Sequence, residues 1–174
     1  MELADSGDLA SKIEQARGLK QFIKESKIWH IFKHLLEGVE ALHSADIAHR
    51  DIKSANIFLF KDGSVKLGDL NVSALACEGS MKTVTGTPYY CPPEVWTNKA
   101  YTPKCDIWSL GCVMYELTAL KPPFVAKNIK DLQKKVTKGE YSPIPDHFSK
   151  NLEELIGACL NVNPSTRLGA SELL

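Results

Sequence analysis

Hydrophobic residues recur every three or four positions between Ser26 and Ser44, and this spacing predicts one amphipathic helix. The apolar positions of this stripe are Ile28, Ile31, Phe32, Leu35, Leu36, Val39 and Leu42. A second stripe of the same kind runs from Leu152 to Leu160. Such stripes are typical of helices that pack into a core, so we interpret both as core faces rather than partner-binding surfaces.

A short β-hairpin is predicted after the first helix. Ile57 to Phe60 forms an apolar run of strand length, Lys61 to Ser64 contains an Asp-Gly turn signal, and Val65 to Leu67 suits the returning strand. Because the turn reverses the chain, Asn56 and Asp69 are expected at neighbouring strand ends. Their side-chain oxygens could then share one metal ion.

The polar stretch from His49 to Asn56 precedes the hairpin and holds the residue types that phosphoryl transfer needs. Asp51 supplies a carboxylate that can orient and deprotonate a hydroxyl, and Lys53 supplies an ammonium group for the phosphate. Asn56, and Asp69 thirteen residues after it, supply oxygen ligands of the kind that Mg²⁺ prefers. A His-Arg-Asp tripeptide alone is equally compatible with a polar turn. The whole constellation favours a catalytic site over that alternative.

The same stretch resembles the catalytic loop of protein kinases. The resemblance implies that Asp51 is the catalytic base and that Asn56 and Asp69 hold magnesium beside ATP. It assigns Lys53 to the transferred phosphate and, from its position after the base, the chain to the serine/threonine class. His49 would pack in the core and hold the loop rather than act as a base.

Two later segments extend this resemblance. Gly86 to Glu94 resembles the end of a kinase activation segment, with Pro92-Pro93-Glu94 where the family usually has Ala-Pro-Glu. Asp106 to Gly111 resembles the start of the central buried helix, in which Asp106 has a structural role. The resemblance also implies that Arg167 forms a buried bidentate pair with the Glu94 carboxylate, which is structural and not catalytic.

Among protein kinases, the chain is most similar to the NIMA-related (NEK) serine/threonine family. The segments that carry this similarity are Met1 to Leu9, Asn56 to Leu59 and Gly86 to Tyr90. The resemblance implies ATP and Mg²⁺ as cofactors. The Ala4 backbone would then meet the adenine, Asp8 would meet the ribose, and Phe58 would lie against the adenine face.

Met1 to Leu9 resembles the hinge between the two kinase lobes, with Met1 at the gatekeeper position. The chain contains no G-x-G-x-x-G loop and no Val-Ala-Ile-Lys-like strand. We therefore expect an α+β fold, namely a protein-kinase-like C-terminal lobe that is mainly helical with a short β-hairpin at the catalytic cleft, the N-terminal lobe being absent. Residues 1–174 would form a partial kinase domain with an activation segment at residues 69–94.

The segment before the Pro-Pro-Glu motif carries several hydroxyl residues. Thr83 matches the usual phosphorylated position, and a phosphate there could order the segment through Arg50. An unmodified polar loop residue is the alternative for Thr83. Thr87 matches a substrate-platform residue that would bond to Asp51 and Lys53.

Composition restricts the class of protein further. With 44% hydrophobic and 24% charged residues, 174 residues can bury one ordinary core. The net charge of zero gives no electrostatic case for nucleic acid or a membrane surface. Five cysteines without a C-x-x-C pair favour reduced thiols and a cytoplasmic or nuclear location. A cytoskeleton-associated location is a further expectation. His30 and His34 have the i, i+4 spacing of zinc ligands but lack a third ligand, so solvent-facing histidines are the better interpretation.

The sequence thus predicts a serine/threonine kinase that transfers the γ-phosphate of ATP to protein Ser/Thr hydroxyls, here as a fragment without the glycine-rich loop and the N-lobe lysine. The alternative is a truncated or pseudokinase-like lobe that acts as a protein-interaction module. The four polar site residues favour the first, and loss of a lobe favours the second. Protein substrates and ATP are the expected partners, and the pattern indicates neither a particular substrate nor an oligomeric state.

Overall fold

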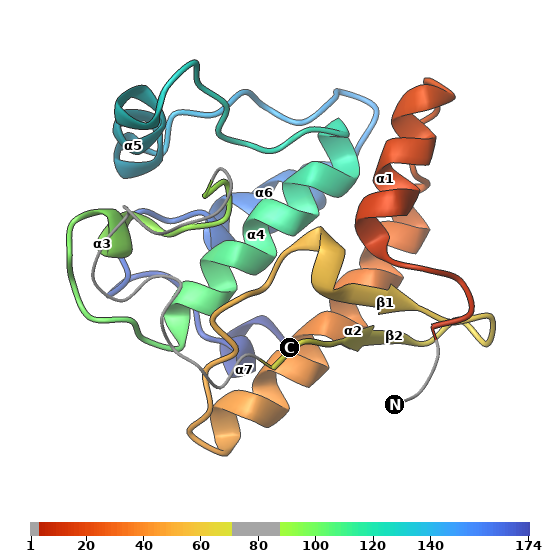
Figure 1. The fold of residues 1–174 in the computed structure, drawn as a ribbon, viewed down its shortest axis with the longest axis horizontal. Coiled ribbons are helices and arrows are strands. Elements are labelled where there is room, and N and C mark those ends of the chain that lie inside the picture. Colours follow the sequence, from red (N-terminus) through yellow and green to blue (C-terminus); the bar gives the residue numbers. More distant parts are fainter. Residues whose placement is uncertain (1–3, 71–87) are drawn as a thin grey trace.

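The computed structural model describes residues 4–70 and 88–174, which form a mainly helical body with one small antiparallel sheet in that part of the chain (Figure 1). The helices are α1 (Leu9–Gly18), α2 (Glu25–Ser44), α3 (Pro93–Trp96), α4 (Lys104–Ala119), α5 (Ile129–Lys138), α6 (Lys150–Cys159) and α7 (Ala170–Leu173). A short 3-10 turn, η1 (Ser54–Asn56), leads into strands β1 (Ile57–Leu59) and β2 (Val65–Leu67). The predicted combination of helices and one hairpin is therefore confirmed.

Helix α2 confirms the prediction made from hydrophobic spacing and begins one residue earlier than expected. Six of the seven predicted stripe residues are buried, and the seventh, Leu42, is only partly buried near the end of the helix. The buried side of α2 packs against α4, and its other neighbours include β2 and α7. The predicted Leu152–Leu160 stripe likewise lies on α6, where Leu152, Ile156 and Cys159 are buried.

The hairpin forms where the sequence analysis predicted it. Ile57 pairs with Leu67 and Leu59 with Val65, so Phe60 falls just outside the strand. The turn is closed by Asp62, whose carboxylate accepts bonds from the backbone and hydroxyl of Ser64 at 2.8 and 2.7 Å. These local bonds explain why a short turn signal was sufficient to place both strands.

Helix α4 is the centre of the core and crosses the middle of the molecule in Figure 1. Every residue from Cys105 to Thr118 is buried, because α2 and α6 pack against it together with the connecting segments. An all-round buried helix has no polar face, so its spacing could not be read as an amphipathic pattern. The helix ends at Leu120, which has a left-handed backbone with φ of 55°.

Gly111 allows α4 and α6 to approach closely, and its replacement provides a test of this packing. A β-carbon at Gly111 would lie 2.6 Å from the β-carbon of Cys159 and 3.1 Å from a methyl group of Leu160. We expect Gly111→Ala to lower the free energy of unfolding by about 1–3 kcal/mol through overpacking. The matched control is Gly38→Ala on α2, where no atom lies within 4 Å and alanine should add about 0.5–1 kcal/mol. Urea denaturation giving both variants the same sign would contradict this account.

Three further findings concern membrane-spanning helices, the paired histidines and the cysteines. No helix in the described ranges is both long and apolar enough to cross a membrane. Nε2 of His30 lies 2.7 Å from the carbonyl oxygen of Gly63, and Nδ1 of His34 lies 3.0 Å from the carbonyl oxygen of His30. Both histidines therefore bind the backbone, which supports the non-metal interpretation. Cys91 is buried, and Cys77 lies outside the described residues.

Candidate functional site

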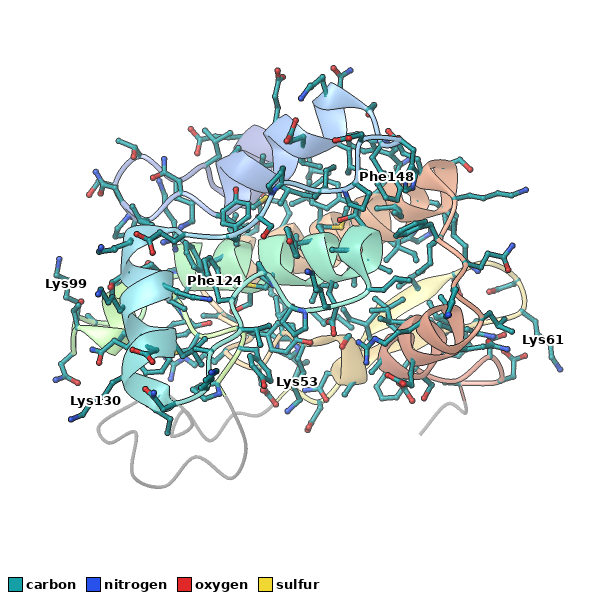
Figure 2. All side chains as sticks on the ribbon, turned by 90° about the horizontal axis from the view of Figure 1, so that it is seen from above. Lys53, Lys61, Lys99, Phe124, Lys130 and Phe148 are labelled. Atoms are coloured by element: carbon teal, nitrogen blue, oxygen red, sulfur yellow. The ribbon has the colours of Figure 1, made fainter. Side chains whose placement is uncertain are left out.

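Asp51 is the centre of a small polar cluster that lies on the far side of α4 from α6, where Figure 2 shows Lys53 extending outward. Nζ of Lys53 donates to Oδ2 of Asp51 at 2.8 Å, and Nδ2 of Asn56 donates to the same oxygen at 2.9 Å. Among the described residues, the other carboxylate oxygen, Oδ1, accepts no hydrogen bond. The side chain of Asp51 is 24% exposed, so this second oxygen can meet a hydroxyl from solvent.

The Asn56 amide has a fixed orientation in this cluster. Nδ2 of Asn56 also donates to the backbone carbonyl oxygen of Asp51 at 2.9 Å. A carboxylate and a carbonyl can only accept, so the amide nitrogen must face Asp51 and the amide oxygen must face the other way. The Asn56 side chain therefore presents an oxygen that can bind a cation.

Asp69 follows the end of β2, and the hairpin brings this point of the backbone close to Asn56. The N–H of Gly68 donates to the carbonyl oxygen of Asn56 at 2.9 Å, which confirms the prediction that Asn56 and Asp69 lie at neighbouring strand ends. Asp69 is exposed and has a left-handed φ of 59°, a conformation that Asp tolerates better than most residues. The ring of Phe58 occupies the space beside Gly68, because a β-carbon there would lie 2.6 Å from it.

A metal ion at this point would need ligands from outside the protein as well. In residues 4–70 and 88–174, no three side chains of the types His, Cys, Asp and Glu gather as a self-contained metal site. The amide oxygen of Asn56 and the carboxylate of Asp69 are hard oxygen donors, which suit Mg²⁺ and not zinc. Two protein oxygens completed by phosphate and water are typical of Mg²⁺ sites.

His49 joins the catalytic stretch to the hairpin. Its Nε2 lies 3.1 Å from the carbonyl oxygen of Gly68, and its Nδ1 accepts the backbone N–H of Asp51 at 3.3 Å. Because a carbonyl oxygen cannot donate, Nε2 must carry the proton and the imidazole is neutral. The side chain is 1% exposed, so it cannot reach a substrate and acts as a support for the loop.

Asp106, at the start of α4, holds the backbone that precedes Asp51. Its carboxylate accepts the backbone N–H groups of His49 at 2.8 Å and Arg50 at 2.9 Å. It also accepts the hydroxyl of Tyr101 at 2.6 Å. Arg50 has a left-handed φ of 70°, which is strained for a side chain of this size, and the bonds to Asp106 offset that strain.

The Asp106 carboxylate stays ionised although it is buried in the core. Burial by itself would raise the pKa of the Asp106 carboxyl. Hydrogen bonds from His43, whose Nε2 lies 2.9 Å from Oδ2, and from Tyr101 and the backbone outweigh burial and hold this pKa below its ordinary value. The carboxylate is therefore ionised at neutral pH and can accept all of these bonds at once.

Glu94 and Arg167 form a bidentate ion pair in the core. Nη1 of Arg167 lies 2.7 Å from Oε1 of Glu94, and Nη2 lies 3.0 Å from Oε2. Arg167 also donates to the carbonyl oxygens of Asn161 and Lys104, and its guanidinium lies 5.1 Å from the centre of the Trp108 ring. Burial opposes ionisation of Glu94, but Arg167 outweighs it and keeps the pKa of this carboxyl below its ordinary value.

Two of the residues expected at a nucleotide, Asp8 and Phe58, lie side by side at β1. Asp8 forms an isolated bridge with Phe58, and the adjacent N–H of Ser6 donates to Leu59. The carboxylate of Asp8 caps α1 by accepting the backbone N–H and the hydroxyl of Ser11 at 2.8 and 2.9 Å. The backbone bond from Ser11 lowers the pKa of Asp8. Asp8 therefore has a capping role that the sequence analysis did not foresee.

Tyr90 was missed as a functional residue. Its hydroxyl donates to Oε2 of Glu116 at 2.6 Å and lies 3.0 Å from the hydroxyl of Ser54, the residue that follows Lys53. Burial, and then the nearby charge of Glu116, raise the pKa of this phenol. Ser54 and Glu116 are separated from Tyr90 by 36 and 26 positions, so no local pattern could have indicated the contact.

Two predicted residues lie outside the described part of the chain. Thr83, the expected phosphorylation site, and Thr87, the expected substrate-platform residue, fall within residues 71–87. Their expected contacts with Arg50, Asp51 and Lys53 stay predictions. The guanidinium of Arg50 lies 5.6 Å from the centre of the Tyr101 ring.

Comparison with known proteins gives a consistent result. A family model described as protein kinase domain matches residues 1–174. The mouse serine/threonine-protein kinase Nek3 is 44% identical over 181 residues, covering 100% of this chain and 34% of the relative. Mouse Nek5 is 44% identical over 100% of this chain and 28% of the relative. A putative serine/threonine-protein kinase A of Trypanosoma brucei brucei is 40% identical over 99% of this chain and 41% of the relative. The chain thus spans well under half the length of these relatives.

Proposed function

The chain belongs to the protein kinase family, and on that basis we propose that residues 1–174 are the hinge and C-terminal lobe of a NEK-like serine/threonine kinase. The reaction is transfer of the γ-phosphate of ATP to Ser/Thr hydroxyls of protein substrates. The printed names of the relatives support the serine/threonine class. The helical body with one hairpin beside the polar cluster supports the assignment to this lobe.

One observation carries this proposal, which is the convergence of Lys53 and Asn56 on a single oxygen of Asp51. Because Oδ2 is held by two donors, the carboxylate cannot rotate freely and Oδ1 is aimed at a fixed point. A substrate hydroxyl bonded to Oδ1 would be oriented for attack and would lose its proton to Asp51 as the bond to phosphorus forms. Positioning of this kind is the main contribution that a protein makes to phosphoryl transfer.

Lys53 has a second role in the proposed reaction. The Lys53 side chain, which forms an ion pair with Asp51, is 39% exposed. Ion pairs exposed to solvent contribute only about 0–1 kcal/mol to stability. The ammonium can therefore turn towards a phosphate at little cost. There it would stabilise the negative charge that spreads over the transferred group.

Asn56 and Asp69 would hold the magnesium that accompanies ATP. The metal supplies neutralisation of phosphate charge when it is bound. The orientation of the Asn56 amide supports this assignment, because its oxygen is the end that Asp51 leaves free. The Ala4 backbone and Asp8 would face the adenine and the ribose, and Phe58 would lie against the adenine.

Regulation belongs to the same proposal. A phosphate on Thr83 would carry nearly two negative charges and could order its segment through Arg50. Thr87 would bond to Asp51 and Lys53 and so connect the substrate platform with the base. Tyr90, which bonds to Ser54, supports a connection between the end of this segment and the catalytic stretch.

The proposed function can be tested by phosphoryl transfer from γ-labelled ATP to a mixed protein substrate in the presence of Mg²⁺. We expect Asp51→Asn to slow transfer at least about a hundredfold, because the amide cannot accept the hydroxyl proton. The matched control is Asp62→Asn in the exposed hairpin turn, which should leave the rate within about twofold. Equal transfer by the wild-type chain and Asp51→Asn would contradict the proposed role of Asp51.

A further inference from the structure

Helix α5 presents a line of positive charge to solvent. Lys130, Lys134 and Lys138 are spaced four residues apart and are all exposed, and we call them the lysine stripe. Leu132 and Val136 are buried on the opposite side of the helix, where α5 packs against α3. Figure 2 shows Lys130 and Lys99 extending outward at this end of the molecule. The stripe therefore faces away from the core.

This charge is concentrated and largely unneutralised. The lysines in and beside α5 are Lys121, Lys127, Lys130, Lys134, Lys135 and Lys138. Residues 121–138 contain these six lysines and a single acid, whereas the whole chain is neutral. Lys138 pairs with Glu140 at 3.4 Å, and Lys130 and Lys134 pair with no acid among the described residues. On α2, by contrast, Lys33 pairs with Glu37 along the helix.

Apolar residues flank the stripe. Val125, which is 46% exposed, lies in the segment before α5, and Ile129, which is 54% exposed, is the first residue of α5 and precedes Lys130. Val162, which is 37% exposed, lies beside Gly139 at the other end of the helix. Exposed apolar side chains near charged ones allow a surface to make apolar as well as charged contacts with a partner. The surface therefore offers both charge and apolar contact.

We propose that the lysine stripe and the flanking Val125 and Ile129 bind an acidic polypeptide segment that carries apolar side chains. The carboxylates of the partner would meet the lysines, and its apolar side chains would cover Val125 and Ile129. This interaction does not depend on phosphoryl transfer. It is an additional function of the helical surface.

The dimensions favour a polypeptide over other polyanions. Lys130 and Lys138 are eight residues apart, which corresponds to about 12 Å along the helix. A few acidic residues span that length. A nucleic acid or an anionic membrane would extend well beyond the stripe, whereas outside residues 121–138 the chain has more acidic than basic residues. The concentration of lysines in this one segment therefore favours a short acidic segment over an extended polyanion.

A groove lies beside Val125 and extends to Tyr90, whose hydroxyl contacts the catalytic stretch. The groove has a volume of about 920 Å³ and is lined by Val125 and Lys135 at one side and by Tyr90 at another. The Tyr90 hydroxyl lies 3.0 Å from that of Ser54, the neighbour of Lys53. A segment bound on α5 could therefore continue past Val125 into the groove, where the basic residues Arg17, Lys121 and Lys135 outnumber the acids Glu116 and Glu140. If the proposed kinase activity holds, such docking would bring acidic partners to the site as substrates.

The test is fluorescence anisotropy of a labelled glutamate-rich peptide with interspersed leucines, measured with the whole chain. The stripe variant is Lys130→Glu, Lys134→Glu and Lys138→Glu combined. We expect the stripe variant to weaken binding by about tenfold or more, because three attractions become repulsions. The same peptide with glutamine in place of glutamate should bind the wild-type chain at least about tenfold more weakly.

A second triple variant controls for net charge. Lys12, Lys27 and Lys33 are exposed on α1 and α2, and their combined replacement by glutamate changes the total charge equally. This control should alter binding by no more than about twofold, since the charges lie away from the stripe. Equal weakening by both triple variants would overturn the proposal. So would tighter binding of a single-stranded oligonucleotide or of phosphatidylserine vesicles than of the peptide.

The apolar contribution is tested separately with Ile129→Asn. We expect this variant to bind the leucine-containing peptide about threefold more weakly, with an unchanged dependence of affinity on salt. A version of the peptide without leucines should bind the variant and the wild-type chain equally. Circular dichroism and urea denaturation establish that each variant is folded. Unchanged affinity of Ile129→Asn for the leucine-containing peptide would overturn the apolar part of the proposal.

Discussion

Replacing Arg167 with methionine is expected to lower the free energy of unfolding by about 3–5 kcal/mol, measured by urea denaturation at neutral pH. The substitution keeps much of the side-chain volume beside Trp108 but removes both hydrogen bonds to Glu94. Glu94 is 4% exposed, so its charge would be left in the core without a counter-charge, although Sγ of Cys105 would still donate to Oε1 of Glu94 at 3.2 Å. The carbonyl oxygens of Asn161 and Lys104 would lose the bonds that Arg167 donates to them as well.

The double variant Glu94→Gln with Arg167→Met separates the buried charge from the lost packing. We expect it to be more stable than Arg167→Met alone, because glutamine in place of Glu94 carries no charge and the core no longer holds an unpaired carboxylate at this position. If the single and double variants unfold at the same urea concentration, the unpaired charge is not the main cause of the loss.

The dependence on pH supplies a second discriminating measurement. The pKa of Glu94 lies below its ordinary value of 4.5, so its contribution to stability is present above about pH 4.5 and is lost as the pH falls through the lower folded value. Without Arg167, burial would raise the pKa of Glu94 above its ordinary value. The contribution of Glu94 to stability would then increase, instead of decrease, as the pH falls. The difference in free energy of unfolding between the wild-type chain and Arg167→Met should therefore become smaller as the pH is lowered towards 4. A deficit that grows over this range would contradict the assignment.

Asp106→Asn is expected to lower the free energy of unfolding by about 3–4 kcal/mol, which is the second of the two largest effects on stability. The carboxylate accepts the backbone N–H groups of His49 and Arg50 and bonds from His43 and Tyr101. An amide keeps one oxygen and places an NH₂ group against donors. The left-handed backbone at Arg50 would lose its restraint, so Asp51 would also be less well positioned.

Tyr101→Phe is the matched control for this prediction. It removes one donor to Asp106 and leaves both backbone bonds in place, so we expect a loss of only about 1 kcal/mol. Urea denaturation of the two variants measures the difference, and phosphoryl transfer measures the effect on positioning. An equal loss of stability in both variants would mean that the backbone bonds of Asp106 contribute nothing.

Local patterns predicted the elements that local interactions stabilise. The spacing of apolar residues placed α2 to within one residue, because a helix of 20 residues repeats its face often enough to be recognised. The hairpin was predicted because its turn is closed by bonds between residues two positions apart, Asp62 and Ser64. The four-residue helix α3 was not foreseen, since it is too short to show a period.

Contacts between segments that are distant in the sequence could be predicted only from family resemblance, and some of them could not be predicted. Arg167 and Glu94 are separated by 73 positions, and Asp106 and His49 by 57. No spacing rule relates such residues, and the pairing with Glu94 was expected because both motifs resemble those of kinases. The bond between Tyr90 and Ser54 had no such precedent in the sequence analysis and emerged from the structure.

By itself, the amino-acid sequence determined the long helix, the hairpin and the chemical types gathered between them, because periodicity and turn chemistry act over a few residues. Tertiary structure decided which oxygen of Asp51 is held, which end of the Asn56 amide is free, and that Asp8 caps a helix. It also decided that the lysines of α5 face solvent together. These outcomes depend on which groups meet after distant segments pack, and hydrogen bonding then selects one orientation of each side chain.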